Sequence, residues 1–434
     1  MCSVPPSPAS RTPSPAVRHP VALEILLRGP ISRAELAQRL DLSLASLTRL
    51  TRPLLRSGLI VEAANHHEPR SGRPVRPLDV VPTAHHFVGV KLTGDDAHAV
   101  ATTLRAEVVA TRLTRLPARE PRSVVAALAD LVAAVAEGVP RLTGLGVCLG
   151  GLTADQRLVR RAPFLEWTDP VPLASMLEQA TGLPTVLAND VLALTRAEHW
   201  FGAARGSSHF AVVTIGAGVG LGLVVHDAIV ESTDAGLGLV GHYPLDPLGP
   251  LCFAGHRGCA SALLTMSSIE ARVSVGLQRR VSYDQCLDLA AHGNPVAVVA
   301  TAESGRALGR LVAAVANLTM ARKIVLTGEG VRLAAVASDA VAEGIRLDRD
   351  PLADALDIGI QHTGFDEWAR GAAATAIQAF VLENYAPDAR SAGAYRGPSP
   401  ASTAAGAVVK AARKRRSASS SSPDAHASSP MVPS

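Results

Sequence analysis

The 434-residue sequence has little cysteine, few aromatic residues and no long apolar run. Its 5 cysteines are scattered and form no disulfide framework. A helix needs about 20 apolar residues to span a membrane, and the run nearest to this, 124–137, is interrupted by Asp130 and Glu137. The Pro/Ser-rich first sixteen residues lack the apolar core of a signal peptide. We therefore expect a cytoplasmic protein with no membrane partner.

Charge is distributed unevenly along the chain. The net charge is +4, but basic residues outnumber acidic ones in residues 1–82 and again in 386–434, whereas 83–385 is acidic in balance. A basic head favours contact with nucleic acid, although a solvated arginine-rich surface would have the same composition. Residues 1–16 are expected to be disordered, and 386–434 to form a disordered basic tail.

Residues 17–82 have the pattern of a winged helix-turn-helix DNA-binding domain. A helical pattern ends near Gly29-Pro30, and Ser32 with Glu35 then matches the S-x-x-E capping box of a second helix. A third helix is predicted from Ser43 to Ser57, with an apolar stripe formed by Leu44, Leu47, Leu50, Leu54 and Leu55.

The third helix has the composition of a recognition helix. Small polar residues followed by arginine let a helix enter the major groove and reach bases and phosphates. A three-helix packing module that binds no DNA is the alternative. Pro53 should kink or break this helix, because proline removes an internal hydrogen bond. The residues predicted to bind DNA are Ser43, Ser46, Thr48, Arg49 and Arg52 on the helix, and Arg73 and Arg76 on the wing.

Residues 83–385 alternate strand and helix patterns, which predicts an α/β domain. The expected strands are 87–94, 97–104, 108–113, 144–149, 183–188, 212–215 and 323–327, and the expected helices are 121–137, 171–180, 190–200, 285–293, 295–318 and 365–382.

Two stretches of this domain carry candidate binding groups. Gly216, Gly218, Gly220 and Gly222 follow a strand, where glycine lets backbone N–H groups approach a bound group. No Gly-Lys-Ser/Thr follows, so this is not a P-loop, and a tight β-turn is the alternative. Asn189-Asp190 lies where a strand enters a helix, a common ligand position in α/β sheets, although either residue could simply cap that helix.

A third stretch has metal-ligand spacing. His242, Cys252, His256 and Cys259 lie within eighteen residues, and imidazole and thiolate both suit tetrahedral zinc. The alternative is that they are ordinary turn and core residues.

Together these stretches resemble the ROK family of sugar kinases and sugar-responsive repressors. The family signature G-E-x-G-H followed by C-x-C-G-x-x-G-C-x-E reads here as GLVGH (238–242) and CFAGHRGCAS (252–261). The resemblance covers about residues 17–385. It implies a two-lobed actin-like, ribonuclease H-like ATPase fold behind the winged helix. It also implies an effector site at Asn189, Asp190, Gly216, Gly218 and His242.

Several positions depart from the family pattern. Lys91 stands where kinases carry the aspartate of D-x-G-G-T, so the resemblance argues against ATP use. Leu239 and Ser261 replace two glutamates that contact sugar, which indicates an altered pocket, with a vacant one as the alternative. Ala254 replaces one zinc-binding cysteine, and His256 could supply the missing ligand to a structural zinc held with His242, Cys252 and Cys259.

The sequence thus predicts a transcriptional regulator, most simply a repressor, and not an enzyme. Its expected partners are a double-stranded DNA operator and a small-molecule effector of the carbohydrate class. Symmetric operators call for paired heads, so we expect a homodimer or a dimer of dimers. One alternative is a sugar kinase with a fused DNA-binding head, and another is a DNA-binding protein that needs no ligand.

Overall fold

The computed structural model describes residues 18–63, 66–67 and 74–385. The segments expected to be disordered, 1–16 and 386–434, lie outside the described residues, as does Arg73. None of the helices in the described ranges combines the length and the apolar character needed to cross a bilayer.

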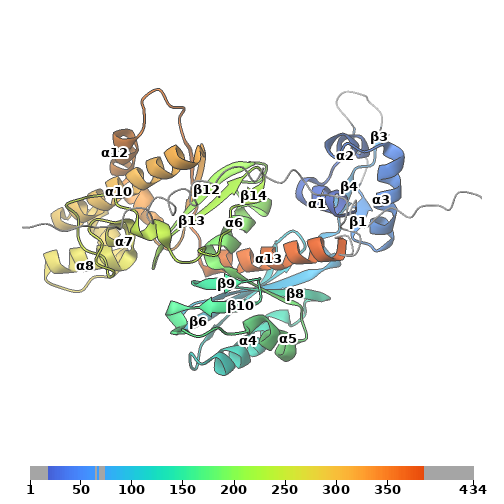
Figure 1. The fold of residues 1–434 in the computed structure, drawn as a ribbon, viewed down its shortest axis with the longest axis horizontal. Coiled ribbons are helices and arrows are strands. Elements are labelled where there is room, and N and C mark those ends of the chain that lie inside the picture. The colour runs from blue at the N-terminus through green and yellow to red at the C-terminus, as the bar shows by residue number, and fades with distance from the viewer. Residues whose placement is uncertain (1–17, 64–65, 68–73, 386–434) are drawn as a thin grey trace, which may run out of the picture. The chain divides into compact units, whose positions relative to one another are not determined.

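The N-terminal head consists of three helices and two small antiparallel strand pairs (Figure 1). Its helices are α1 (Arg18–Arg28), α2 (Arg33–Arg39) and α3 (Leu44–Arg56); its strands are β1 (Ile60–Glu62), β2 (His66–His67), β3 (Pro74–Val75) and β4 (Leu78–Val80). Strand β1 pairs with β4, and β2 with β3, so the sheet of a wing follows α3 directly. Ser32 accepts a hydrogen bond from the Glu35 amide at 3.1 Å and so caps α2, whereas the Glu35 carboxylate pairs with Arg39.

Helix α3 differs from the sequence-based expectation in its continuity and in its apolar stripe. It continues through Pro53 to Arg56 without a break. Leu50 and Leu54, both 1% exposed, anchor the turns on either side in the core, and this packing outweighs the single hydrogen bond that proline removes. The predicted apolar stripe is also shorter than expected, because Leu44 is 58% exposed.

The described residues that follow the head, up to residue 385, form two lobes, each built on a five-stranded sheet. The first sheet has the order β11-β8-β5-β6-β7 and the second β14-β13-β12-β15-β16. In both, the first strand in the sequence is central, pairs antiparallel with the second and parallel with the fourth. The same strand order in both lobes is that of the expected ribonuclease H-like fold.

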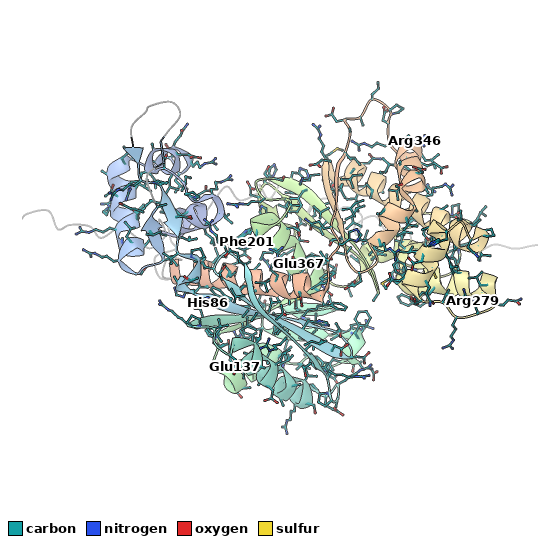
Figure 2. The ribbon with its side chains drawn as sticks, turned by 180° about the vertical axis from the view of Figure 1, so that it is seen from behind. His86, Glu137, Phe201, Arg279, Arg346 and Glu367 are labelled. Atoms are coloured by element: carbon teal, nitrogen blue, oxygen red, sulfur yellow. The ribbon has the colours of Figure 1, made fainter. Side chains whose placement is uncertain are left out.

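The first lobe contains β5 (His86–Leu92), β6 (Asp96–Thr103), β7 (Val108–Arg115), α4 (Pro121–Ala136), β8 (Leu142–Leu149), β9 (Leu152–Ala154), β10 (Leu158–Arg161), α5 (Leu173–Thr181), β11 (Thr185–Asn189), α6 (Asp190–Phe201) and α13 (Phe365–Tyr385). The buried side of α4, with Val124, Leu128 and Val135 0% exposed, packs with this sheet, and Glu137 at its C-terminal end is labelled in Figure 2.

The second lobe contains β12 (His209–Ile215), β13 (Val219–Val225), β14 (Ala228–Ile229), α7 (Ala260–Leu264), α8 (Met266–Leu277), α9 (Tyr283–Ala291), α10 (Pro295–Thr319), β15 (Lys323–Thr327), α11 (Arg332–Val336), α12 (Ser338–Asp348) and β16 (Asp357–Ile360). Its core includes residues of β12 and β15 together with apolar residues of the long helix α10.

Helix α13 returns to the first lobe, as the sequence predicts, and lies directly on the sheet. A Cβ added to Gly89 of β5 or to Gly146 of β8 would collide with backbone atoms of α13. Helix α13 also packs on α6, and Figure 2 labels Glu367 and Phe201 on these two helices. This close approach brings the first turn of α13, with Trp368, to the end of β5.

The head shares a hydrophobic core with the first lobe. Ile25 of α1 and Leu78 of β4 belong to one buried cluster with Phe87 of β5, Trp200 of α6 and Ile377 of α13. The Arg205 guanidinium donates from Nε to the Leu27 carbonyl at 2.8 Å. The head, which carries the predicted DNA-binding residues, is therefore in direct contact with the α/β domain.

Candidate functional site

The exposed side of α3 carries the predicted DNA-binding residues. Ser43 caps the helix by accepting a hydrogen bond from the Ser46 amide at 3.2 Å, and the two hydroxyls are 3.0 Å apart. Thr48, Arg49 and Arg52 are exposed. Both arginines therefore lie on the surface opposite the buried stripe, one helical turn apart.

The wing is partly described. Arg76 is exposed, and its guanidinium lies 3.7 Å from the Glu62 carboxylate, which Arg33 also contacts at 2.6 Å. These two arginines join the wing to the start of α2. They also hold the pKa of Glu62 below its ordinary value, through the Arg33 hydrogen bond first and then the charges of both guanidinium groups.

In the first lobe, Lys91 and Asp190 form a buried ion pair between β5 and α6. Their side chains are only 8% and 15% exposed, and the Lys91 ammonium also lies 4.8 Å from the centre of the Trp368 ring. Burial works to lower the pKa of Lys91, but the Asp190 charge, with help from Cys148 and Glu329, raises it above its ordinary 10.5. The pair with Asp190 therefore favours the charged form of Lys91.

Both predicted effector contacts at the start of α6 are engaged within the protein. Asn189 caps α6 by accepting from the Val191 amide at 3.0 Å, and its amide nitrogen donates to the Gly151 carbonyl at 3.2 Å. Asp190 accepts from the Val191 amide at 2.9 Å with one oxygen and from Lys91 with the other. The capping alternative is thus correct for Asn189.

The glycine run forms a β-hairpin. Strands β12 and β13 are antiparallel, with Ile215 opposite Val219, so Gly216–Gly218 is the turn. None of the four glycines adopts a left-handed φ, so conformational freedom does not require them. Close packing explains Gly216, Gly220 and Gly222, whereas a Cβ on Gly218 would meet nothing within 4 Å. A Cβ on Gly222 would collide with Thr195 of α6, and one on Gly220 would lie 2.6 Å from the Thr214 hydroxyl. Only Gly216 and Gly218 remain candidates for approaching a ligand.

The side chain of Glu329, which the sequence patterns did not indicate as a site residue, also lies at this turn. The Glu329 carboxylate, in the turn after β15, occupies the space beside Gly216 that a Cβ would need. Burial and the charge of Asp190 raise the pKa of Glu329, while Lys91 and the Trp368 indole oppose this. An isolated Glu in a Gly-Glu-Gly turn gives no signal of where its side chain points.

A cavity of about 400 Å³ lies where α1 and α2 of the head approach α6. It is lined by Leu27, Arg28, Glu35, Arg39, His199, Trp200, Arg205, Gly206 and Asp227. None of the predicted effector contacts is among these residues.

The four predicted metal ligands come together in the second lobe. Cys252 Sγ lies 3.7 Å from His242 Nδ1 and 3.8 Å from His256 Nδ1, and Cys259 Sγ lies 3.9 Å from His242 Nδ1. The segment folds back tightly because the Cys252 amide donates to the His256 carbonyl at 2.9 Å and Gly255 takes a left-handed φ of 82°. His242 ends the short helix η4 (Leu239–His242) and so joins this group from a separate turn.

These distances fit a tetrahedral zinc ion. Zn–S and Zn–N bonds of about 2.3 and 2.0–2.1 Å place sulfur and nitrogen ligands about 3.6 Å apart. All four ligand atoms lie within 4.8 Å of one another. Two thiols and two imidazoles are a common structural zinc set. His256 therefore occupies a position from which it could replace the thiolate that Ala254 lacks.

The other departures lie near this group. Leu239 is 65% exposed at the start of η4, and the buried Ser261 hydroxyl packs beside Gly241. Among the described contacts, none joins His242 to Asn189 or Asp190; its imidazole lies with Cys252, His256, Cys259 and the Phe253 ring.

Comparison with known proteins agrees with this architecture. The ROK family profile matches residues 87–379. The DNA-binding transcriptional dual regulator NagC of Escherichia coli is 30% identical over 69% of this chain and 77% of its own length. The DNA-binding transcriptional repressor Mlc of the same organism is 25% identical over 81% of this chain and 89% of its own.

Two solved structures are also similar. A ROK family transcriptional regulator homologous to Mlc superposes with a TM-score of 0.74 and 25% identity, covering 86% of this chain and 98% of its own. The ROK hexokinase of Thermus thermophilus has a TM-score of 0.58 and 25% identity, covering 68% of this chain and 99% of its own. The regulator thus also covers part of the chain that the hexokinase does not. With a family profile across most of both lobes and relatives that extend beyond them, this chain belongs to the ROK family.

Proposed function

We propose that this protein is a DNA-binding transcriptional regulator, acting as a repressor, whose ROK domain binds a carbohydrate-class effector without phosphorylating it. The observation that carries this proposal is the exposed arginine surface of α3, on a winged helix that shares its core with a ROK domain. The names of the regulators NagC and Mlc, to which the chain is similar, support it.

Helix α3 has the surface that major-groove recognition requires. Its N-terminal turn presents the short side chains of Ser43 and Ser46, so the helix can approach base edges closely. The exposed Leu44 offers an apolar contact for a thymine methyl group. Arg49 and Arg52 can reach guanine edges or phosphates from the next two turns. On the wing, Arg73 and Arg76 would contact phosphates or the minor groove.

The engaged Asp190 carboxylate favours a receptor over a phosphotransfer enzyme. A general base must have a free carboxylate within reach of the substrate hydroxyl, and here both Asp190 oxygens are engaged by Lys91 and the Val191 amide. The kinase alternative draws on the retained Asp190 and the hexokinase-like lobes. Asp190-dependent phosphate transfer from ATP to a hexose would establish that alternative and overturn our proposal.

An effector that binds at Asn189 and Asp190 would find both side chains already hydrogen-bonded within the protein. It must therefore exchange those internal bonds for its own, which reduces the net gain per contact to about 0.5–1.5 kcal/mol. A thermal-shift screen with neutral sugars and sugar phosphates tests for such a ligand, because binding to the folded state raises the Tm. No shift with any of them would favour the ligand-independent alternative.

We also propose a structural zinc ion on His242, Cys252, His256 and Cys259. The ion would brace the segment that carries these residues. Burial and the neighbouring His256 lower the pKa of His242, which keeps its imidazole in the neutral form that binds a metal. Elemental analysis should find about one equivalent per chain, and less than about half would count against the site.

The proposed assembly is a homodimer or a dimer of dimers, because one α3 covers only half of a symmetric operator. Light scattering coupled to size exclusion would give its mass directly. A monomer at every concentration that still binds a two-fold operator would contradict this part.

The experiment that tests the function is selection of duplex oligonucleotides from a random pool by the full-length protein. We expect enrichment of a two-fold symmetric sequence with half-sites about one helical turn, or a multiple of it, apart. A pool that stays random after successive rounds would refute the proposed function.

A further inference from the structure

A loop of the second lobe, residues 231–238 between β14 and η4, reaches the first lobe at the start of α6. Gly236 packs so closely there that a Cβ on it would lie 2.1 Å from the Gly151 carbonyl oxygen and 3.1 Å from the side-chain nitrogen of Asn189. Its φ of 98° is also one that glycine adopts without strain. The loop therefore covers the side-chain amide of Asn189, which is only 5% exposed.

A single ion pair attaches this loop to the first lobe. Within the described part of the chain, the main-chain hydrogen bonds of residues 231–238 stay inside the segment 231–241. The Glu231 carboxylate accepts a hydrogen bond from the Arg196 guanidinium at 2.7 Å, the one side-chain bond described between the loop and another part of the chain. A segment with so few bonds to its surroundings opens at a low cost in free energy.

The partner of Glu231 is a buried cation on α6. The Arg196 side chain is 4% exposed, and its guanidinium also donates to the Thr375 hydroxyl of α13 at 3.2 Å. Its Nε is buried and has no hydrogen-bond partner among the described residues. Since a buried charge is costly without a partner of opposite sign, Arg196 favours the position of the loop in which Glu231 reaches it.

We propose that loop 231–238 is a strap that closes over Asn189, and that Arg196 is a positioning residue that keeps the strap closed through Glu231. The inference rests on the proposed effector contact at Asn189 and adds how that contact is reached. The strap must lift before a carbohydrate hydroxyl can meet the Asn189 amide, because the main chain of Gly236 lies against it. The strength of the Arg196–Glu231 pair therefore sets the fraction of molecules that are open to the effector.

Alkylation of a thiol at position 189 tests the strap without any effector. In full-length Asn189→Cys, iodoacetamide should modify the new thiol only while the strap is open, and mass spectrometry of the peptide gives the rate. Adding Arg196→Met releases Glu231 and leaves no buried charge. We expect alkylation to become at least about tenfold faster, because the closed state loses one charge-assisted hydrogen bond.

Two further variants make the result specific. Glu231→Gln should give a similar gain but also a lower Tm, because Arg196 then stays buried without its partner, whereas Arg196→Met should retain the Tm of the parent. Arg272→Met is the matched control, because it breaks another pair between a mostly buried arginine and a half-exposed glutamate, Glu303. It should leave the alkylation rate at position 189 unchanged.

Limited proteolysis gives the answer if Asn189→Cys does not fold. With Asn189 intact, thermolysin should cleave before the exposed Leu237 faster in Arg196→Met than in the parent, because cleavage follows the open population. An unchanged rate of alkylation or of cleavage in Arg196→Met, or an equal gain in Arg272→Met, would overturn the proposal. Neither assay contains a sugar or DNA, so failure of the strap is distinct from failure of the proposed function.

Discussion

Replacing Lys91 by methionine should destabilise the first lobe strongly, because it leaves the Asp190 carboxylate buried without its partner. Breaking a buried pair from one side costs about 3–5 kcal/mol. Asp190 is 15% exposed and retains the Val191 amide as a donor, so we expect the lower end, about 3 kcal/mol. For a cooperative unit of about 150–250 residues this lowers the Tm by about 6–12 °C.

The double variant Lys91→Met/Asp190→Asn should recover most of that loss, because no charge then remains buried, and its stability should lie within about 1 kcal/mol of the parent. Lys323→Met is the matched control. It breaks a 2.7 Å lysine–aspartate pair whose Asp357 side chain is 68% exposed, so it should cost only about 0–1 kcal/mol.

Urea unfolding, monitored by tryptophan fluorescence, gives the free energy of unfolding of all these variants. The pH dependence adds a second criterion. The folded pKa of Lys91 lies above its ordinary 10.5, so the pair stabilises the fold fully below about 10.5 and loses this contribution as the pH rises further. A Lys91→Met cost no larger than that of Lys323→Met, or no recovery in the double variant, would refute the reasoning.

Three other predictions follow from the structure. His256→Ala and Cys252→Ala should each reduce the bound zinc, measured by elemental analysis, below half an equivalent. The control Cys286→Ala, in the core of the same lobe, should leave the zinc content unchanged. Full zinc in His256→Ala would show that His256 is not the fourth ligand. Burial, with the charges of Arg141 and His86, lowers the pKa of His85 to about 4, so the stability held by its neutral ring is present above 6.5 and is lost as the pH falls toward 4. His85→Phe should remove this part of the acid sensitivity in chemical unfolding at pH 4–7, and an unchanged profile would contradict the assignment. Gly146→Ala should lower the free energy of unfolding of the first lobe by more than about 2 kcal/mol, and its Tm with it, because the new Cβ would collide with the backbone of α13. The control is Gly359→Ala, whose Cβ would meet nothing within 4 Å. An equal Tm for the two variants would contradict the close approach of α13.

The periodic elements could be read from the sequence because local patterns determine them. Helix α10 was expected at 295–318 and spans Pro295–Thr319, and β5 and β8 were expected within one to two residues of their bounds. The short elements α8, α12 and β9–β10 were not predicted. Both helices pack on α10, and β9 and β10, only three and four residues long, pair with each other across a tight turn.

The site was predictable where its residues are close in sequence. The metal cluster lies within eighteen residues, so spacing alone indicated it. The partners of Lys91 could not be deduced in the same way, because Asp190 and Trp368 are 99 and 277 positions further along the chain and only the sheet order and the approach of α13 bring them together. Glu329 was missed for the same reason.

The expectation about Pro53 was wrong because it considered only local structure. A local rule predicted a kink or break in α3, but burial of Leu50 and Leu54 on either side keeps the helix continuous. Local propensity is a weak guide where tertiary packing is strong.

The most direct measurement of the central claim is the affinity of the full-length protein for a selected duplex as a function of salt, with Arg49→Ala, Arg52→Ala and the exposed second-lobe control Arg346→Ala. We expect each α3 variant to lose about 1–3 kcal/mol of binding free energy if it contacts a base, or to reduce the salt slope by about one if it contacts a phosphate. Arg346→Ala should match the parent. If both α3 variants bind with the affinity and the salt slope of the parent, then α3 does not contact DNA and the account is wrong.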